Sequence, residues 1–153
     1  MKKLIISQKE AVKVVDIRKP VEGYTIELPL FLESVSAGFP SPADDYLEAK
    51  LDLNKHLIKN PSATFFVRVT GDSMINAGIH SGDILVVDRS LTPKNGSIVI
   101  AIIDTELIVK RMQLIKNKIF LVPENPNFEP IEISGEMNFE VWGVVSTVIH
   151  SVL

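Results

Sequence analysis

The 153-residue sequence predicts a mainly β domain with a short helical element at its front and an extended N-terminal arm. Its length allows one complete hydrophobic core, because single domains usually hold roughly 100 to 150 residues. Val, Ile and Phe, which favour strands, dominate the second half, and Gly, Asn-Gly and Pro interrupt the apolar runs where turns are expected. The predicted strands are 64–70, 84–88, 97–103, 106–112, 118–122 and 139–149.

The first 37 residues are a segment of a different kind. They hold six basic and five acidic residues and short strand-like runs such as 12–17, but no apolar face at helical period. Small residues and two prolines in Ala37-Gly38-Phe39-Pro40-Ser41-Pro42 then interrupt both helix and sheet. We therefore expect an arm over 1–37 and a body over 38–153. A helix-turn-helix DNA reader needs about three helices, which this arm cannot supply.

A helical element is predicted between this break and the first strand of the body. Ser41 is a typical N-cap, Pro42 suits the first helical position, and Asp44 places an acid in the first turn. The element would end at Asn60-Pro61, and Asp52 leaves open whether it is one helix or two short ones. The residues that recur at helical spacing are Leu47, Leu51, Asn54 and Ile58.

Composition excludes several classes of function. The net charge is −3, and the body carries ten basic residues against fourteen acidic ones, so strong direct DNA binding is not expected. The absence of Cys excludes disulfides and a cysteine nucleophile, and no motif specifies a metal or cofactor. The apolar start of the chain stops at Ser7, and the longest aliphatic run, 98–103, is far below the roughly 20 residues that span a bilayer. We therefore expect a cytoplasmic protein without a membrane segment.

Ser73 is the first candidate for chemistry. It lies in Gly71-Asp72-Ser73-Met74, directly after the predicted strand 64–70, so a turn at Gly71 can display it at a strand end. Taken alone, this tetrapeptide favours a capped turn over a nucleophile, and a nucleophilic serine also needs a base. No histidine has a neighbouring acid placed to suggest a triad, and we interpret all three as surface residues: His56, His80 and His150.

Lys110 is the better candidate for the base. In the predicted strand 106–112, alternation places Lys110 on one face with Ile108 and Met112, and Arg111 on the other. Apolar neighbours favour burial, which disfavours the ammonium form and lowers the pKa of a lysine from about 10.4 towards 7. Only a neutral amine can accept the serine proton, which Arg111 cannot do because its guanidinium stays charged. The alternative is that Lys110 extends from a sheet edge into solvent.

Five segments follow one another in a characteristic order: Gly71-Asp72-Ser73-Met74, Gly82-Asp83-Ile84-Leu85, Asn95-Gly96, Val109-Lys110-Arg111 and Pro123-Glu124-Asn125. Ser73 and Lys110 are 37 positions apart. This order and spacing resemble the LexA/UmuD family of self-cleaving Ser-Lys peptidases. The likeness is strongest to UmuD-type members and extends over the segments before the body: Gly38-Phe39-Pro40-Ser41-Pro42-Ala43, Asp52-Leu53-Asn54 and Pro61-Ser62-Ala63-Thr64.

The resemblance implies a fold and a set of site residues. The fold would be LexA-like, as in signal peptidases, with Ser73 as nucleophile and Lys110 as general base. The bond cut would be Ala37–Gly38, whose small side chains allow a strand-end serine to approach the carbonyl closely. Backbone N–H groups from Asp72 to Met74 would stabilise the oxyanion. The arm is longer than in the best-known UmuD, and the bond is Ala-Gly, as in LexA, where that protein has Cys-Gly.

The resemblance also implies partners. Cleavage would occur when a RecA filament on single-stranded DNA acts as coprotease, and the shortened homodimer would join a UmuC-like Y-family polymerase in error-prone synthesis past lesions. The alternative in a regulatory class is a LexA-like or phage-type self-cleaving transcriptional regulator, which needs a DNA-binding domain. A signal-peptidase-like enzyme would need a membrane anchor, and a binding module with an inert Ser73 is the remaining alternative.

Overall fold

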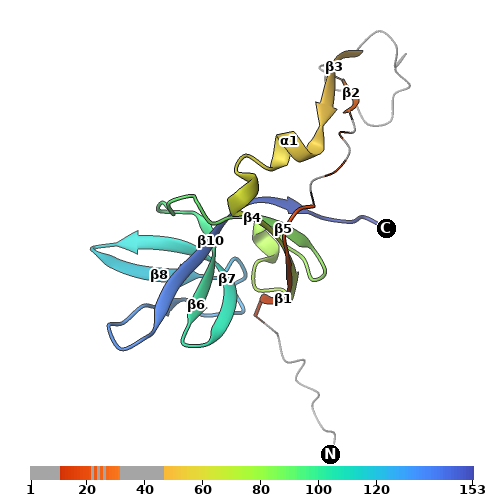
Figure 1. Ribbon diagram of the computed structural model, residues 1–153. Helices are drawn as coiled ribbons and strands as arrows, with labels where there is room; N and C mark the ends of the chain where they lie inside the picture. The colour runs from red at the N-terminus through yellow and green to blue at the C-terminus, as the bar shows by residue number, and fades with distance from the viewer. Residues whose placement is uncertain (1–10, 22, 24, 26, 32–46) are drawn as a thin grey trace, which may run out of the picture. The chain divides into compact units, whose positions relative to one another are not determined.

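A computed structural model describes the chain except for residues 1–10, 22, 24, 26 and 32–46 (Figure 1). The contacts within the chain divide it into two compact units. The first combines Met1–Pro20 with Asn60–Leu153, and the second is Val21–Lys59. The predicted arm boundary at Ala37–Gly38 lies outside the described residues.

The first unit is mainly β, as predicted. The predicted strands of the body are confirmed, although β7 runs to Ile115, beyond the expected end, and the two-residue strand β9 was not predicted. Single turns of 3-10 helix lie at Pro61–Ala63 and Ile75–Ala77. The strands are β1 (Lys13–Arg18), β4 (Thr64–Thr70), β5 (Ile84–Asp88), β6 (Ile98–Ile103), β7 (Glu106–Ile115), β8 (Lys118–Val122), β9 (Ile131–Glu132) and β10 (Phe139–Ile149).

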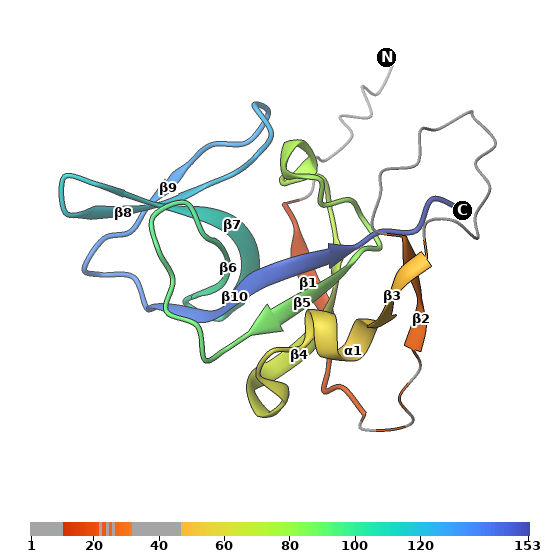
Figure 2. The same cartoon turned by 90° about the horizontal axis from the view of Figure 1, so that it is seen from above.

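The sheet of the first unit closes on itself. Its strand order is β1-β4-β5-β10-β6-β7-β8-β9, and an additional pairing joins β1 to β7 (Figure 2). The strands from β1 round to β7 therefore form a ring, while the hairpin of β8 and the short β9 extend beyond it. Closure through β1 covers the edges of β4 and β7, which would otherwise expose unpaired backbone groups.

Two clusters of buried side chains form the core of this unit. The larger one joins the arm to the body, because Val12 is fully buried together with residues of β4, β5 and β7. Its buried members are Val12, Val67, Val69, Met74, Ile79, Leu85, Val87, Ile100 and Val109. The smaller one lies towards β8 and comprises Val99, Ala101, Ile108, Met112, Leu121 and Val144. The strand-like run predicted over 12–17 is thus part of the folded core.

The second unit corrects the helix prediction. Residues 47–52 form a strand, β3 (Leu47–Asp52), and the helix α1 covers only Leu53–Leu57. Leu47 and Leu51 fit a helical spacing, but β3 pairs antiparallel with β2 (Glu27–Phe31), and this long-range pairing decides the conformation. The side chain of Asp52 accepts hydrogen bonds from the N–H groups of Asn54 and Lys55, which starts the helix there. The predicted start at Ser41–Asp44 lies outside the described residues.

Within the part of the chain that the structure describes, no helix has the length and apolar character needed to cross a membrane.

Candidate active site

The end of β4 places Ser73. Gly71 has a φ of 99°, a left-handed conformation that favours glycine, and its N–H donates to Ser81 Oγ at 3.3 Å. The chain therefore turns sharply after Thr70, as the sequence predicted, and enters the 3-10 turn Ile75–Ala77. Ser73 is fully buried at this turn, beside the buried side chain of Met74.

A second loop holds the Ser73 turn in place. Asn125 Nδ2 donates to the carbonyl oxygen of Asp72 at 2.9 Å, and the N–H of Asn76 donates to the carbonyl oxygen of Glu124 at 2.9 Å. Glu124 also forms an ion pair with Arg111 on β7. Asn125 was not predicted as a site residue, and its only signal in the sequence is the segment Pro123-Glu124-Asn125 within the resemblance. We therefore add Asn125 as a residue that positions the turn.

Lys110 is buried on β7. Only 3% of it is exposed, so the alternative in which it extends into solvent is wrong. It pairs with Val99 of β6, and its Nζ lies 5.8 Å from the centre of the Phe128 ring. Burial lowers the pKa of Lys110 from 10.5 to about 8, because the apolar surroundings disfavour the ammonium form. A neutral amine is therefore accessible near physiological pH.

Arg111, the neighbour of Lys110, has a different role. Its side chain is about one-third exposed, and it donates to the carbonyl oxygen of Gly96 at 2.7 Å in addition to its ion pair with Glu124. The strand alternation thus separates the two basic residues as predicted. Arg111 links β7 to the loops on either side and makes no described contact with Ser73.

Ser73 and Lys110 come together in space. Lys110 Nζ lies 2.9 Å from Ser73 Oγ, within hydrogen-bond distance. At this distance a neutral amine can take the hydroxyl proton directly, which makes the oxygen a nucleophile. Among the described residues, the hydrogen-bond partners of Ser73 Oγ are Lys110 and Val12.

The backbone beside Ser73 has donors available. None of the N–H groups of Asp72, Ser73 and Met74 donates to a backbone carbonyl among the described residues. The Asp72 carboxylate has one buried oxygen, Oδ1, for which the described residues supply no donor. Backbone N–H donors and a carboxylate acceptor therefore both lie next to Ser73 in the chain.

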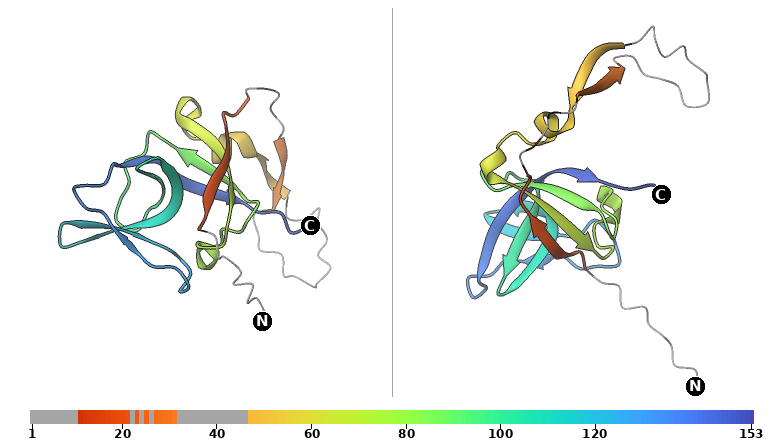
Figure 3. Two further views of the ribbon diagram at one scale, coloured as in Figure 1. Left: turned by 90° about the horizontal axis from the view of Figure 1, so that it is seen from below. Right: turned by 45° about the vertical axis from the view of Figure 1, so that its right-hand side comes forward.

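The N-terminal strand reaches into this site. The N–H of Val12 donates to Ser73 Oγ at 2.8 Å, and the carbonyl oxygen of Val12 accepts from the N–H of Val109 at 3.3 Å. Lys13 then pairs with Thr70 of β4 on one side and Ile108 of β7 on the other. Figure 3 shows β1 as the red strand of the first unit. The sequence predicted a strand here, but no local signal revealed that its first residues lie on the serine.

His80 and His150 lie at the surface, as predicted, with side chains that are 43% exposed, but they share an acid neighbour that was not predicted. Asp83 is buried, and its Oδ1 lies 2.6 Å from Nδ1 of His150, while its Oδ2 accepts the backbone N–H of His80 at 2.7 Å. Both histidines therefore have an acid beside them. Within the described residues, these three side chains are the group whose ligand atoms lie close enough, within 4.8 Å, to hold a metal. Both Asp83 oxygens already have hydrogen-bond partners, so the cluster is explained as a link between the loop before β5 and the end of β10.

The remaining predicted site residues lie elsewhere. His56 lies on α1 in the second unit and is exposed, as predicted. Ala37 and Gly38, the predicted cleavage site, are outside the described residues.

A buried serine within hydrogen-bond distance of a buried lysine, in a unit built on a closed β-sheet, is the arrangement expected of a serine peptidase with a Ser-Lys dyad. The model of the Peptidase S24-like family matches residues 29–146, a range that includes Ser73 and Lys110. The chain belongs to this family, and it is a UmuD-like member of the LexA/UmuD self-cleaving peptidases.

Relatives agree with this assignment. The chain is 52% identical over 122 residues to protein SamA of Salmonella typhimurium, covering 80% of this chain and 84% of that protein. It is 46% identical over 127 residues to protein MucA of Escherichia coli, covering 82% and 84%. It is also 46% identical over 100 residues to the LexA repressor of Hahella chejuensis, covering 65% of this chain and 50% of the repressor.

Proposed function

We propose that this UmuD-type protein of SOS mutagenesis cuts its own Ala37–Gly38 bond with Ser73 as nucleophile and Lys110 as general base. The observation that carries the proposal is the 2.9 Å separation of Lys110 Nζ and Ser73 Oγ in a buried site. The lowered pKa of Lys110, about 8, supports it further, because a base with a pKa near the working pH is the most effective.

In the first step, the neutral amine of Lys110 takes the Ser73 proton while Ser73 Oγ attacks the carbonyl carbon of Ala37. The carbonyl oxygen becomes an oxyanion, and the N–H groups of Asp72, Ser73 and Met74 are the donors that we assign to it. The absence of a Cβ on Gly38 lets the bond lie close to the buried serine.

In the second step, the bond between Ala37 and the nitrogen of Gly38 breaks. The Lys110 ammonium returns its proton to the leaving amine, and Ala37 stays on Ser73 as an ester. The amine of Lys110, neutral again, then activates a water molecule that hydrolyses the ester. The products are an arm that ends at Ala37 and a body that begins at Gly38.

The family likeness supports a role for the cut protein. We assign a RecA filament on single-stranded DNA as the coprotease that promotes cleavage, and a homodimer of the shortened chain as the product. This dimer would act as the accessory subunit of a UmuC-like Y-family polymerase in translesion synthesis. A repressor role would need a DNA-reading module, and the match to the LexA repressor extends over half of that protein.

One experiment tests this proposal. The purified protein is incubated with RecA, a slowly hydrolysed ATP analogue and single-stranded DNA, and intact-mass spectrometry searches for a product that begins at Gly38. The product is expected with RecA, more slowly without it at alkaline pH, and not with Ser73→Ala. A cut at another bond, or an equal yield from Ser73→Ala, would contradict the proposal.

A further inference from the structure

The strand that closes the sheet ring lies where a substrate strand would bind. Val12 uses its N–H on Ser73 and its carbonyl on Val109, and the strand then continues between the edges of β4 and β7. An extended peptide can bind a protein as an added strand along exposed sheet edges, and a peptide that reaches Ser73 in this way would need the edges that β1 covers. Two strands cannot use these edges at the same time.

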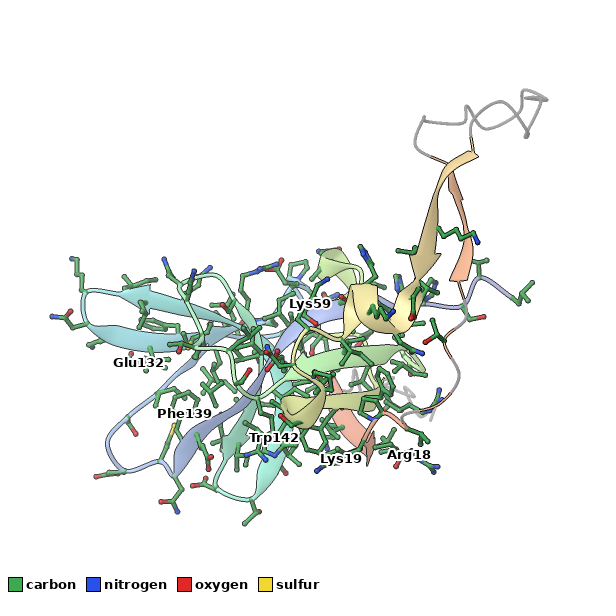
Figure 4. All side chains as sticks on the ribbon, turned by 45° about the horizontal axis from the view of Figure 1, so that its top comes forward. Arg18, Lys19, Lys59, Glu132, Phe139 and Trp142 are labelled. Atoms are coloured by element: carbon green, nitrogen blue, oxygen red, sulfur yellow. The ribbon has the colours of Figure 1, made fainter. Side chains whose placement is uncertain are left out.

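Val12, the residue just before β1, and side chains of β1 itself pack the strand in this place. Val12 is fully buried in the larger core cluster, and Val14 and Ile17 pack against that cluster. Past the end of the strand, Lys19 Nζ lies 5.5 Å from the centre of the Phe65 ring, which packs edge-to-face on Trp142. Lys19 and Trp142 are labelled in Figure 4. Burial of apolar side chains at several positions makes occupation by β1 the favoured state.

The peptide bond next to Ser73 is Ala11–Val12, just before β1. It shares its first residue type with the proposed cleavage site but differs in the second. Ala11–Val12 begins with alanine, as Ala37–Gly38 does, but has a β-branched residue where the cleavage site has glycine. The N–H of Val12 points at Ser73 Oγ, so the oxygen is held as an acceptor on the nitrogen side of the amide. Attack would need the oxygen over the carbonyl carbon of Ala11 instead.

We infer that β1 is an internal competitor for the catalytic cleft: residues 12–18 occupy the strand position next to Ser73, and self-cleavage requires this strand to leave. The inference rests on the proposed function, because the segment that replaces β1 is the one that holds Ala37–Gly38. A trigger of cleavage would then act by shifting the equilibrium between the two occupants, and Val12 would be the residue that holds the inhibited state.

A matched pair of variants tests the competition. Val12→Asp places a charge in a fully buried position and weakens the docking of β1, while Val15→Asp makes the same change at a position on the same strand that is 54% exposed. Since burial of a valine side chain is worth about tenfold or more in an equilibrium, Val12→Asp should raise the rate of Gly38 product formation without RecA by roughly 10-fold or more. Val15→Asp should leave it within about twofold of the unchanged protein. Equal rates for the two variants, with both folded by circular dichroism, would overturn the inference.

A reversible cross-link tests it in the opposite direction and does not require β1 to be destabilised. Lys13 and Thr70 are paired across β1 and β4, and the chain has no cysteine, so Lys13→Cys with Thr70→Cys creates one defined disulfide. The oxidised protein should form no Gly38 product with or without RecA, and reductant should restore it. Cleavage of the oxidised protein at the rate of the reduced one, or a new N-terminus at Val12 in any variant, would show that β1 does not block the serine.

A third measurement separates this inference from the proposed function. A fluorophosphonate reagent phosphonylates a nucleophilic serine: the Ser73 oxygen bonds to phosphorus, fluoride leaves, and Lys110 takes the proton. Labelling of Ser73 should rise in Val12→Asp and fall in the oxidised cross-linked protein, whichever bond the enzyme cuts. If labelling of Ser73 changes as expected in these variants but no Gly38 product forms, the proposed cleavage site is wrong and the inference about β1 is supported. If the Gly38 product forms but labelling ignores β1, the competition is wrong.

Discussion

Pairing around the ring of strands is continuous between β6 and β7 but sparse between β1 and β7. β6 and β7 pair without interruption from Ile98↔Arg111 to Ile103↔Glu106. By contrast, β1 meets β7 at the single pair Lys13↔Ile108, and its pairing with β4 shifts register between Val14 and Asp16. Ser73 and Lys110, the proposed dyad, lie beside this sparse pairing, where Val12 contacts Ser73. Lys110 thus lies on a strand that is continuously paired with β6, while β1, the strand that we infer must leave, has a single pair with β7.

The largest expected effect comes from removing the proposed nucleophile, Ser73, from the turn after β4. Ser73→Ala deletes the attacking oxygen and keeps a small side chain at a turn that other contacts hold, notably the Asn125 bond to Asp72. Formation of the Gly38 product should fall at least about a thousandfold. The rate is measured by intact-mass spectrometry, and near-ultraviolet circular dichroism checks the fold. Residual cleavage at a comparable rate would place the nucleophile elsewhere.

The next effect concerns the base and its pH dependence. Because burial lowers the pKa of Lys110 to about 8, the neutral fraction should rise about tenfold per pH unit below that value and level off above it. The rate of self-cleavage without RecA should follow this curve between pH 6 and 10. Lys110→Arg keeps the charge but cannot release its proton, so it should be inactive throughout.

Two results would argue against Lys110 as the base: a flat profile of rate against pH in the unchanged protein, or activity in Lys110→Arg.

The same pKa shift also affects the stability of the fold. The folded pKa lies below the unfolded one, so the unfolded chain binds more protons between pH 8 and 10.5. The contribution of Lys110 to the free energy of unfolding should therefore increase as the pH rises through that window.

A smaller effect on the cleavage rate is expected from a change at the proposed cleavage site, Ala37–Gly38. Gly38→Val turns the proposed cleavage site into an Ala-Val pair, which is the pair that β1 presents as Ala11–Val12. The β-branched side chain restricts the backbone and moves the carbonyl away from the serine, so product formation should slow roughly 10- to 100-fold. Single-turnover rates with RecA measure this. Gly38→Ala is the control and should be slowed less, and equal rates for all three proteins would mean that the cut lies at another bond.

The smallest effect is expected beside the base, on the other face of β7. Arg111→Lys keeps the charge opposite Glu124 but loses the hydrogen bond to the carbonyl oxygen of Gly96. Since a partly exposed ion pair is worth about 1 kcal/mol or less, the rate should change by less than about fivefold, and the alkaline rise should stay at the same pH. A shifted pH midpoint in this variant would show that Arg111 influences the proton on Lys110.

Much of the body could be predicted from local patterns. The strands 64–70, 84–88, 118–122 and 139–149 begin and end where their β-branched runs and flanking turn residues indicate. The turn at Gly71 and the separation of Lys110 from Arg111 followed from glycine geometry and strand alternation. The spacing of Leu47 and Leu51, however, fits a helix as well as the strand that pairing with β2 selects. The sequence thus predicted short-range features and failed where a distant partner decides.

Local sequence patterns were enough to predict a mainly β chain with a serine at a strand-end turn and a lysine among apolar neighbours on a later strand. Three features could be seen only in the folded chain: Lys110 is buried against Ser73, Asn125 holds the turn, and the N–H of Val12 donates to Ser73 Oγ. The physical reason is that propensity and alternation act over a few residues along the chain. Burial, a shifted pKa and the closure of a ring instead depend on strands that lie dozens of positions apart.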